Sequence, residues 1–353
     1  MTKHFLLINE HGSDNIGDHA INEGLKELLD EKGITHTSTS FLIRKTARPK
    51  KNNTQKKKIS LSFISKIIFS FKPLFHLWWF IKNRSAIKKI LDDDYDGVII
   101  GGGQLILSGF AFPIAMYSWI KHAKNRNLPV FVVGVGCGEN FLFSETLLYK
   151  NALKKCEKIF VREQASVIKM HSFFSLNVGF SPDLAFALYP IKTQKTVSGI
   201  IVGMTDFDVY KRYKKEMQST DFPDYDSYLT DWSDRLIKLL INKDEIIYLV
   251  STTFKDAECN QDLYKQLLNR VSNPIKLIDG VMPLDEYRLL LSQARLVFSG
   301  RMHSLILGLV ENCYIEPWVI SCKISGFLNT YENYTVQNLQ EKLSKDLELF
   351  NIL

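Results

Sequence analysis

Short runs of apolar residues alternate with longer helical stretches along almost the whole chain of 353 residues. In the first half the runs include HFLLIN (4–9), GVIIG (97–101) and PVFVVG (129–134), and in the second half GIIVGM (199–204) and EIIYLV (245–250). Continuous apolar strands that alternate with helices are typical of parallel sheets covered by helices on both faces. Two such series predict an α/β protein with two doubly wound domains.

The joint between the two series is predicted in YPIKTQKTVS (189–198), a polar stretch that follows the last apolar run of the first half. The sequence thus predicts an N-terminal domain over 1–190, a C-terminal domain over 198–330 and a C-terminal helical tail over 331–353. Ligands of doubly wound sheets bind beyond the carboxyl ends of the strands. We therefore expect a central cleft that the two domains face.

A basic and aromatic insert at 44–82 interrupts the alternation in the N-terminal domain. Its lysine-rich start, RKTARPKKNNTQKKK (44–58), leads into an apolar run that Lys66, Lys72 and Pro73 interrupt. A spanning helix needs about 20 uninterrupted apolar residues, so the insert is not predicted to cross a membrane. Two interpretations stay open: an interfacial helix pair on an anionic membrane surface, or a helical hairpin packed on the first domain.

Charge, cysteine content and the first residues narrow the class of protein. The net charge of +7 lacks the clustered excess of a nucleic-acid binder, so no nucleic-acid partner is predicted. The five cysteines are scattered without a C-x-x-C pair, and they predict neither a disulfide framework nor a zinc site. The first apolar run is too short for a signal peptide. We expect a cytoplasmic protein.

The first predicted strand ends in NEHGSDNIGDHAINEGL, a turn rich in small polar residues before a helix that begins near Gly17. Free backbone N–H groups at such a helix start suit an anion. The motif is neither a Walker loop nor G-x-G-x-x-G, so it does not predict nucleotide binding. Asn15 and Gly17 are candidates for the cleft. The alternative is a capped turn in which Asp14, Asn15 and Asp18 satisfy backbone donors.

A glycine cluster follows the next buried strand in DGVIIGGGQLI. Consecutive glycines lose extra conformational entropy on folding, so their use is the close approach of a helix or a ligand. Because they stand at the carboxyl end of a strand, Gly101, Gly102 and Gly103 are predicted to line the cleft. The acidic run at 92–94 precedes that strand and would lie at the opposite edge of the sheet. We assign no metal site.

Cations stand at the ends of three further predicted strands. Arg162 ends the strand in KIFVREQAS, Arg301 and His303 stand in the strand-to-helix turn of LVFSGRMHSLILGL, and Lys323 follows the next strand. Charges inside apolar segments indicate a partner or a function. Three cations and a histidine match a small, multiply anionic ligand, and histidine exchanges protons near neutral pH. For Arg162, an ion pair with Glu163 or a neighbour is the structural alternative.

Six motifs, taken in order, resemble the polysaccharide pyruvyl transferases. They are N-x-G-D in GSDNIGDHAI, the strand plus GGG in YDGVIIGGG, VRE-x-x-S in IFVREQAS, PD in FSPDLAF, R-x-H in SGRMHSLILGL and the later lysine in WVISCK. The resemblance runs from about Phe5 to Leu328, and it departs from the family pattern at Gln104 and in the long insert. It implies two Rossmann-like halves of GT-B type, phosphoenolpyruvate as donor and a pair of sugar hydroxyls as acceptor. It also implies donor-binding arginines at Arg162 and Arg301, and a catalytic or donor-binding histidine at His303.

The residue types fit ketal formation without a metal or a cofactor, with phosphoenolpyruvate as co-substrate. The three cations are predicted to hold the donor's carboxylate and phosphate. His303 is the predicted general acid or base. Asp18 is the catalytic candidate that deprotonates the incoming hydroxyl, and Asp183 at the cleft is a second candidate.

The sequence predicts an enzyme of polysaccharide biosynthesis that moves pyruvate from phosphoenolpyruvate onto a sugar of a cell-surface polysaccharide, such as an exopolysaccharide, or of its lipid-linked precursor. The alternative is a GT-B-type glycosyltransferase with a nucleotide-sugar donor, whose pyrophosphate the same arginines and helix start would bind. The insert adds a further expectation. Its lysines, together with Trp78 and Trp79, would attach the enzyme peripherally to the inner face of the cell membrane, where a lipid-linked acceptor lies.

Overall fold

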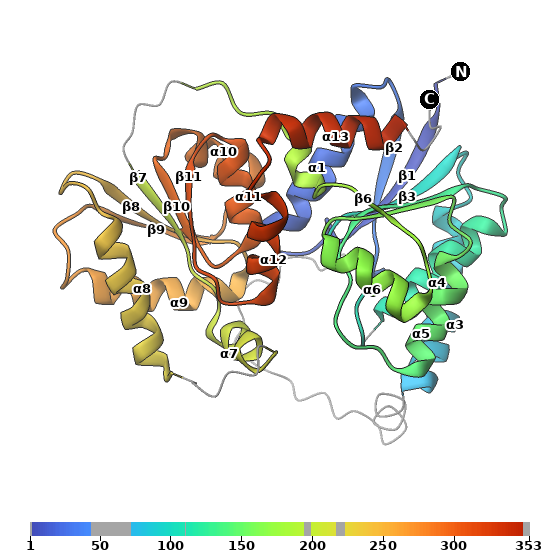
Figure 1. The fold of residues 1–353 in the computed structure, drawn as a ribbon, viewed down its shortest axis with the longest axis horizontal. Coiled ribbons are helices and arrows are strands. Elements are labelled where there is room, and N and C mark those ends of the chain that lie inside the picture. Colours follow the sequence, from blue (N-terminus) through green and yellow to red (C-terminus); the bar gives the residue numbers. More distant parts are fainter. Residues whose placement is uncertain (1, 44–71, 110, 194–198, 217–222, 349–353) are drawn as a thin grey trace. The chain divides into compact units, whose positions relative to one another are not determined.

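The structure is a computed structural model, and it describes residues 2–43, 72–109, 111–193, 199–216 and 223–348. Within these ranges the chain forms two compact units, each built on one parallel sheet (Figure 1). The alternation of apolar runs and helices thus predicted the fold class correctly: two parallel sheets with alternating helices are present.

The two units are not continuous in sequence. Unit 1 consists of Met1–Gly12, Leu28–Asp183 and Leu343–Leu353, and unit 2 consists of Ser13–Glu27 and Leu184–Lys342. The start of the first helix therefore packs with the second half of the chain, and the end of the last helix packs with the first half. The predicted boundary at 189–198 does not anticipate that one segment near each end of the chain belongs to the other half's unit.

Unit 1 contains a six-stranded sheet in the order β2-β1-β3-β4-β5-β6, with all neighbours parallel. The chain leaves β1 toward β2 on one side and continues from β3 on the other, so the order reverses between β1 and β3. This reversal is where ligands of such sheets bind. The strands are β1 His4–Asn9, β2 Thr35–Ser40, β3 Gly97–Gly101, β4 Val130–Val135, β5 Lys158–Val161 and β6 Gly179–Phe180.

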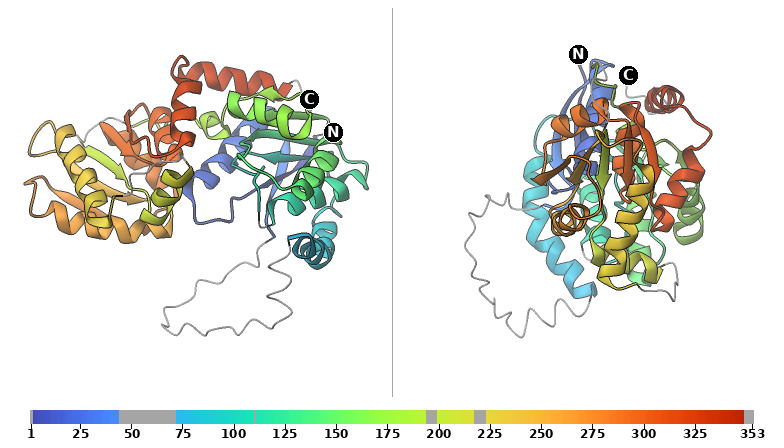
Figure 2. Two further views of the ribbon diagram at one scale, coloured as in Figure 1. Left: turned by 60° about the horizontal axis from the view of Figure 1, so that its bottom comes forward. Right: turned by 90° about the vertical axis from the view of Figure 1, so that its left-hand side faces the viewer.

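Four helices pack side by side in chain order and cover one face of this sheet (Figure 2). They are α3 Lys72–Ile90, α4 Phe112–Lys124, α5 Phe143–Leu153 and α6 Gln164–Phe174. Every residue of β3 and β4 is buried, which explains why both strands are continuous apolar runs. Trp119 of α4 is buried in the same core, and its indole N–H donates to the carbonyl of Phe41 at 2.8 Å.

Helix α3 begins inside the predicted insert, and Pro73 occupies its first turn, where a proline is tolerated. Trp79 is 7% exposed and belongs to the core of unit 1, and Trp78 packs against this core with Lys82 4.4 Å above its ring. The expectation that both tryptophans reach a membrane is therefore wrong for Trp79, because the core covers its indole. The remainder of the insert, 44–71, lies outside the described residues.

Unit 2 contains a five-stranded parallel sheet in the order β11-β10-β7-β8-β9. Here the order reverses between β7 and β10, so the turn after β10 stands at a ligand-binding position. The strands are β7 Gly199–Gly203, β8 Ile246–Ser251, β9 Ile275–Val281, β10 Leu296–Ser299 and β11 Tyr314–Pro317. The helical elements are α1 Ile16–Asp30, the 3-10 helix η1 Leu184–Ala187, α7 Phe207–Glu216, α8 Tyr225–Leu239, α9 Phe254–Leu267, α10 Leu284–Gln293, α11 Met302–Val310, α12 Cys322–Tyr331 and α13 Val336–Glu348; α1 and α13 also reach into unit 1.

None of the helices in the described ranges is both long enough and apolar enough to cross a bilayer.

Candidate active site

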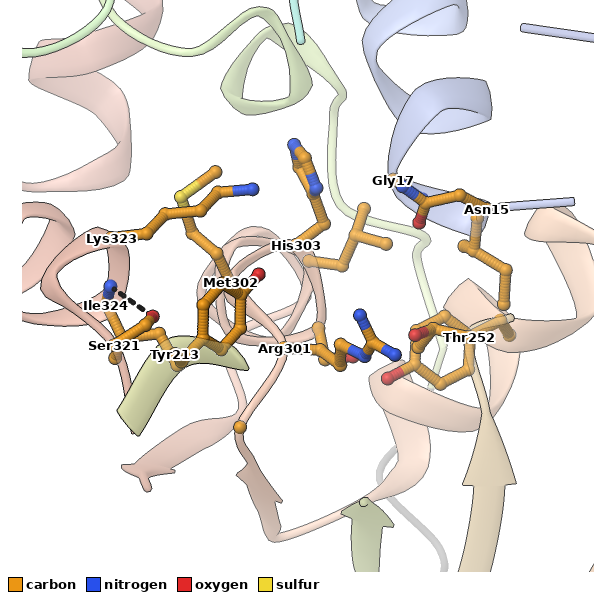
Figure 3. Close-up of a pocket in the computed structure, with 15 residues that line it drawn as sticks. Asn15, Gly17, Tyr213, Thr252, Arg301, Met302, His303, Ser321, Lys323 and Ile324 are labelled. Atoms are coloured by element: carbon orange, nitrogen blue, oxygen red, sulfur yellow. Dashed lines mark hydrogen bonds between the residues drawn. The ribbon is translucent and has the colours of Figure 1, made fainter. Parts of the chain in front are cut away.

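A polar pocket opens in unit 2 beside the point where the strand order reverses (Figure 3). The turn after β10 and the starts of α1, α11 and α12 form most of its wall. The described residues that line it are Asn15, Ile16, Gly17, Tyr213, Thr252, Tyr287, Gly300, Arg301, Met302, His303, Ser304, Leu307, Ser321, Lys323 and Ile324. Five residues predicted from the sequence, namely Asn15, Gly17, Arg301, His303 and Lys323, thus lie together.

The pocket is built to attract negative charge. Three helices, α1, α11 and α12, begin at its wall, and the first N–H groups of a helix carry partial positive charge. Arg301 is the N-cap of α11 and provides no side-chain acceptor to those N–H groups. None of the described lining residues is acidic. Arg301 and Lys323 add two positive charges to the wall, and the carboxylate of Asp256 pairs with Arg301 from behind it.

The side chains approach the pocket from different elements. Lys323 from α12 and the ring of His303 from α11 project into the same region (Figure 3). The guanidinium of Arg301 lies nearer to Thr252 and Asn15. Ser321 caps α12 by accepting a hydrogen bond from the Ile324 N–H at 3.4 Å. Arg301 before α11 and Lys323 in α12 thus line the pocket from different elements, as suits a ligand with two anionic groups.

Contacts with the loop after β8 hold the start of α1 at this pocket. Ile16 donates its N–H to the Thr252 carbonyl at 3.1 Å, and Phe254 donates its N–H to Asp14 Oδ2 at 3.1 Å. Asn15 accepts the Gly17 N–H on its side-chain oxygen at 3.0 Å. The predicted capping role is therefore present for Asn15, which also lines the pocket, whereas Asp14 accepts a backbone N–H of α9 instead of one in its own turn.

Gly17 lies directly against His303. A Cβ atom placed on Gly17 would stand 2.1 Å from Nδ1 and 2.4 Å from Cγ of the His303 ring. His303 is 9% exposed and is therefore closely packed. Two motifs at opposite ends of the chain, N-x-G-D and R-x-H, thus meet in one site, and the glycine leaves room for the histidine.

Asp256 is a functional candidate that the sequence analysis missed. Its fully buried carboxylate accepts hydrogen bonds from Arg301 Nη2, from the Asp206 N–H at 2.9 Å, from Thr252 Oγ1 at 3.0 Å and from the Thr253 N–H at 3.1 Å. Burial lowers the pKa of Arg301, but the charge of Asp256 and its hydrogen bond outweigh this effect and raise the pKa, so Arg301 stays charged. The available signal was Thr253-x-x-Asp256, which has the form of a capping box and predicts a helix start.

Helices α7, α10 and α11 supply three hydroxyl groups of the pocket that were also missed. Tyr213 contributes from α7, Tyr287 from α10 and Ser304 from α11. Burial raises the pKa of Tyr287, so its hydroxyl remains protonated and can donate a hydrogen bond. Hydroxyl residues are common in all parts of a chain, so nothing in the local sequence distinguishes these three.

Unit 1 contains further predicted residues, namely Arg162, Asp183 and the three glycines. Arg162 is 1% exposed and pairs with Asp183 at 2.9 Å and with Glu163 at 3.1 Å. Gly102 and Gly103 have φ angles of 70° and 73°, which favour glycine, and both make backbone hydrogen bonds to the end of β4 or the turn after it. These contacts give Arg162 and the glycine cluster a structural role, which was the alternative interpretation of both motifs. A donor-binding or acceptor-binding role for them stays a prediction.

Asp18 does not line the pocket, although its neighbour Gly17 does. It accepts a hydrogen bond from the Ser13 hydroxyl at 2.6 Å and is partly exposed. Its role as a base stays a prediction. The described part of the chain contains no group of three or more His, Cys, Asp or Glu residues that could hold a metal ion.

Comparisons with known proteins identify the family and the fold. The sequence model of the polysaccharide pyruvyl transferase family matches residues 15–314. No curated protein sequence matches the chain. Among solved structures, a putative UDP-N-acetylglucosamine 2-epimerase from Listeria monocytogenes is similar with a TM-score of 0.55 at 10% identity, covering 99% of this chain and 88% of that one. The UDP-GlcNAc 2-epimerase from Methanocaldococcus jannaschii has a TM-score of 0.50 at 11% identity over 99% of both chains. At such identities the likeness shows the fold alone, a GT-B-like pair of Rossmann-like domains.

Proposed function

Because the chain belongs to the polysaccharide pyruvyl transferase family, we propose that it transfers pyruvate from phosphoenolpyruvate to a sugar of an exopolysaccharide or of its lipid-linked precursor. The product is a ketal that bridges two hydroxyls of the sugar. The observation that carries the proposal is the pocket at Arg301, which combines two cations, three helix starts and a buried histidine. Phosphoenolpyruvate carries a phosphate and a carboxylate on one carbon, and it matches this charge.

Each group in the pocket has a part in this reaction. Helix N-termini and an arginine fork are suited to phosphate and carboxylate, so Arg301 and Lys323 hold the two anionic ends of the donor. They also stabilise the charge on the departing phosphate. His303 lines the same pocket as these cations, and it acts as general acid toward the donor's methylene group.

The reaction balances without a further reactant. His303 delivers a proton to the methylene carbon, and one sugar hydroxyl forms a bond to the central carbon. The bond from that carbon to the phosphate oxygen then breaks, and the second hydroxyl attacks to close the ring. Of the two protons that the hydroxyls lose, one replaces the proton from His303 and the other leaves on the phosphate. Asp18 is the proposed acceptor for the first hydroxyl proton.

The test is ligand-dependent thermal unfolding, because a ligand that binds the native state alone must stabilise it. At one hundred times its Kd, phosphoenolpyruvate should add about 2.7 kcal/mol to the free energy of unfolding. The His303→Ala variant should keep this stabilisation but lose the transfer of label from phosphoenolpyruvate to a glycan extract of the source cells. If a nucleotide sugar raises the melting temperature and phosphoenolpyruvate does not, the protein is a glycosyltransferase and the proposal is wrong.

We also propose that the enzyme works on the cytoplasmic side of the cell membrane as a peripheral protein. The support now comes from α3, which carries five basic and no acidic residues. Its exposed side presents Leu74, Leu77 and Ile81, spaced three and four residues apart. Such a helix suits an anionic lipid surface, where its cations meet the headgroups and its apolar residues enter the boundary.

A further inference from the structure

The carboxylate of Asp256 lies behind Arg301 in unit 2 and does not itself line the pocket. Both of its oxygens are occupied. Oδ1 accepts from Arg301 and from the N–H of Asp206, and Oδ2 accepts from the hydroxyl of Thr252 and from the N–H of Thr253. The carboxylate is thus fixed by the turn before α7 and by the loop before α9, which makes it a rigid support.

Arg301 has few other restraints within the described residues. Its Nε makes no hydrogen bond, and its ion pair is the one with Asp256. Its backbone N–H donates to Ser299 Oγ at 2.9 Å, which fixes the main chain but not the guanidinium. An arginine whose guanidinium is already held by one carboxylate loses its rotamer freedom before the ligand binds. Its other N–H groups can then donate hydrogen bonds to the ligand.

We propose that Asp256 is a positioning residue that aims the Arg301 guanidinium at an anionic group of the donor. This inference rests on the proposed function, because it takes phosphoenolpyruvate as the ligand of the pocket. Asp256 does not touch the donor, and it acts through Arg301. Its removal should therefore weaken donor binding more than it slows the chemical steps.

Unit 2 contains a matched control in the pair of Glu245 and Arg295. Glu245 is also fully buried, its partner is also partly exposed, and the two side chains lie 2.7 Å apart. Neither residue lines the pocket. Glu245 also accepts a backbone N–H, from Ile241, as Asp256 does from Thr253. Removal of the charge of either carboxylate should lower the stability of unit 2. Only the removal of the Asp256 charge should also weaken the binding of the donor.

The experiment compares Asp256→Asn with Glu245→Gln. We expect Asp256→Asn to raise the KM for phosphoenolpyruvate roughly tenfold to a hundredfold, the range for a hydrogen bond between charged groups, with a smaller change in kcat. Glu245→Gln should leave this KM unchanged even where both variants melt at lower temperature. In an Arg301→Lys background, Asp256→Asn should add little, because the two residues act as one unit. Asp256→Glu, which keeps the charge and shifts it by one methylene, serves if the asparagine variant does not fold.

The outcomes separate this inference from the proposed function. If Asp256→Asn and Glu245→Gln lose similar stability and neither changes the KM, Asp256 is structural and the inference is overturned. If wild-type protein neither uses phosphoenolpyruvate nor is stabilised by it, the proposed function fails. Inorganic phosphate then becomes the probe: a phosphate-dependent rise in melting temperature that Asp256→Asn loses and Glu245→Gln retains supports the positioning role. The same rise in both variants overturns it.

Discussion

Replacement of Gly17 by alanine tests whether the N-x-G-D motif exists to position His303. The added methyl group would lie 2.1 Å from Nδ1 and 2.4 Å from Cγ of the ring. Nonbonded carbon atoms rest at about 3.5–4.0 Å, so the ring must move by more than about 1 Å. The imidazole is buried beside the pocket, and this movement changes its place relative to a bound donor.

The expected effects on stability and activity differ in size. Overpacking costs about 1–3 kcal/mol, and alanine in place of glycine within a helix returns up to about 1 kcal/mol. The free energy of unfolding should thus fall by about 0–3 kcal/mol. A misplacement of about 1 Å at a reacting group costs about a hundredfold in rate. The variant should therefore remain folded at ordinary temperature and lose most of its transfer activity.

Two other helical glycines provide the controls. Gly24 lies in the same helix, but its added Cβ would meet the Leu184 carbonyl oxygen at 2.1 Å, away from the pocket. Gly326 in α12 has open space around it. Gly24→Ala should lose stability and Gly326→Ala should gain a little, with activity retained in the folded protein. Transfer of label from phosphoenolpyruvate and thermal unfolding are measured for all three variants. Full activity in Gly17→Ala would refute the argument that this glycine positions His303.

Three further predictions concern charge, metal and membrane. Arg301→Lys should raise the KM for phosphoenolpyruvate about tenfold, since a bidentate fork is lost while the charge remains, and an unchanged KM would remove Arg301 from the donor site. EDTA should leave the transfer rate unchanged, because the proposed charge stabilisation comes from Arg301 and Lys323; inhibition that magnesium or manganese reverses would contradict the scheme. In co-sedimentation with anionic vesicles, the double variant Leu77→Ser, Ile81→Ser should bind less than wild-type protein. The control is the double variant Leu147→Ser, Ile168→Ser, which changes exposed sites of α5 and α6 and should bind as well as wild-type protein. Wild-type binding should weaken with salt, and wild-type protein that stays in the supernatant at low salt would end the membrane proposal.

The fold was predictable because the pattern that indicates it, apolar strands alternating with helices, can be read from short segments of the sequence. Strands buried on both faces must be apolar throughout, and β3 and β4 are fully buried, so their runs were visible. Arg301, His303 and Lys323 were visible for the opposite reason, since charged groups beside apolar strands and helices are costly without a role. These signals depend on single segments, and they needed no knowledge of tertiary contacts.

The features that escaped prediction depend on contacts between distant segments. Asp256 has the local pattern of a helix cap, and its contact with Arg301 joins two loops that are far apart in the chain. The packing of 13–27 with unit 2 is equally invisible, because this segment stands between two strands of unit 1. Trp79 was assigned to a surface because aromatic residues beside lysines fit a membrane boundary, but the same residues also fit a helix that covers a sheet.

The six motifs divide between the two units of the structure. N-x-G-D, R-x-H and the later lysine meet at the pocket of unit 2, although the first stands near the start of the chain. VRE and PD meet in unit 1 through the ion pair of Arg162 with Asp183, and GGG follows β3 in the same unit. In the proposed reaction the first group supplies the positive charge that holds the donor. Both groups contain an arginine that is paired with a fully buried carboxylate, Arg301 with Asp256 and Arg162 with Asp183, so the ion pair by itself does not distinguish their tasks. A donor-binding role for Arg162 therefore stays a prediction beside that for Arg301.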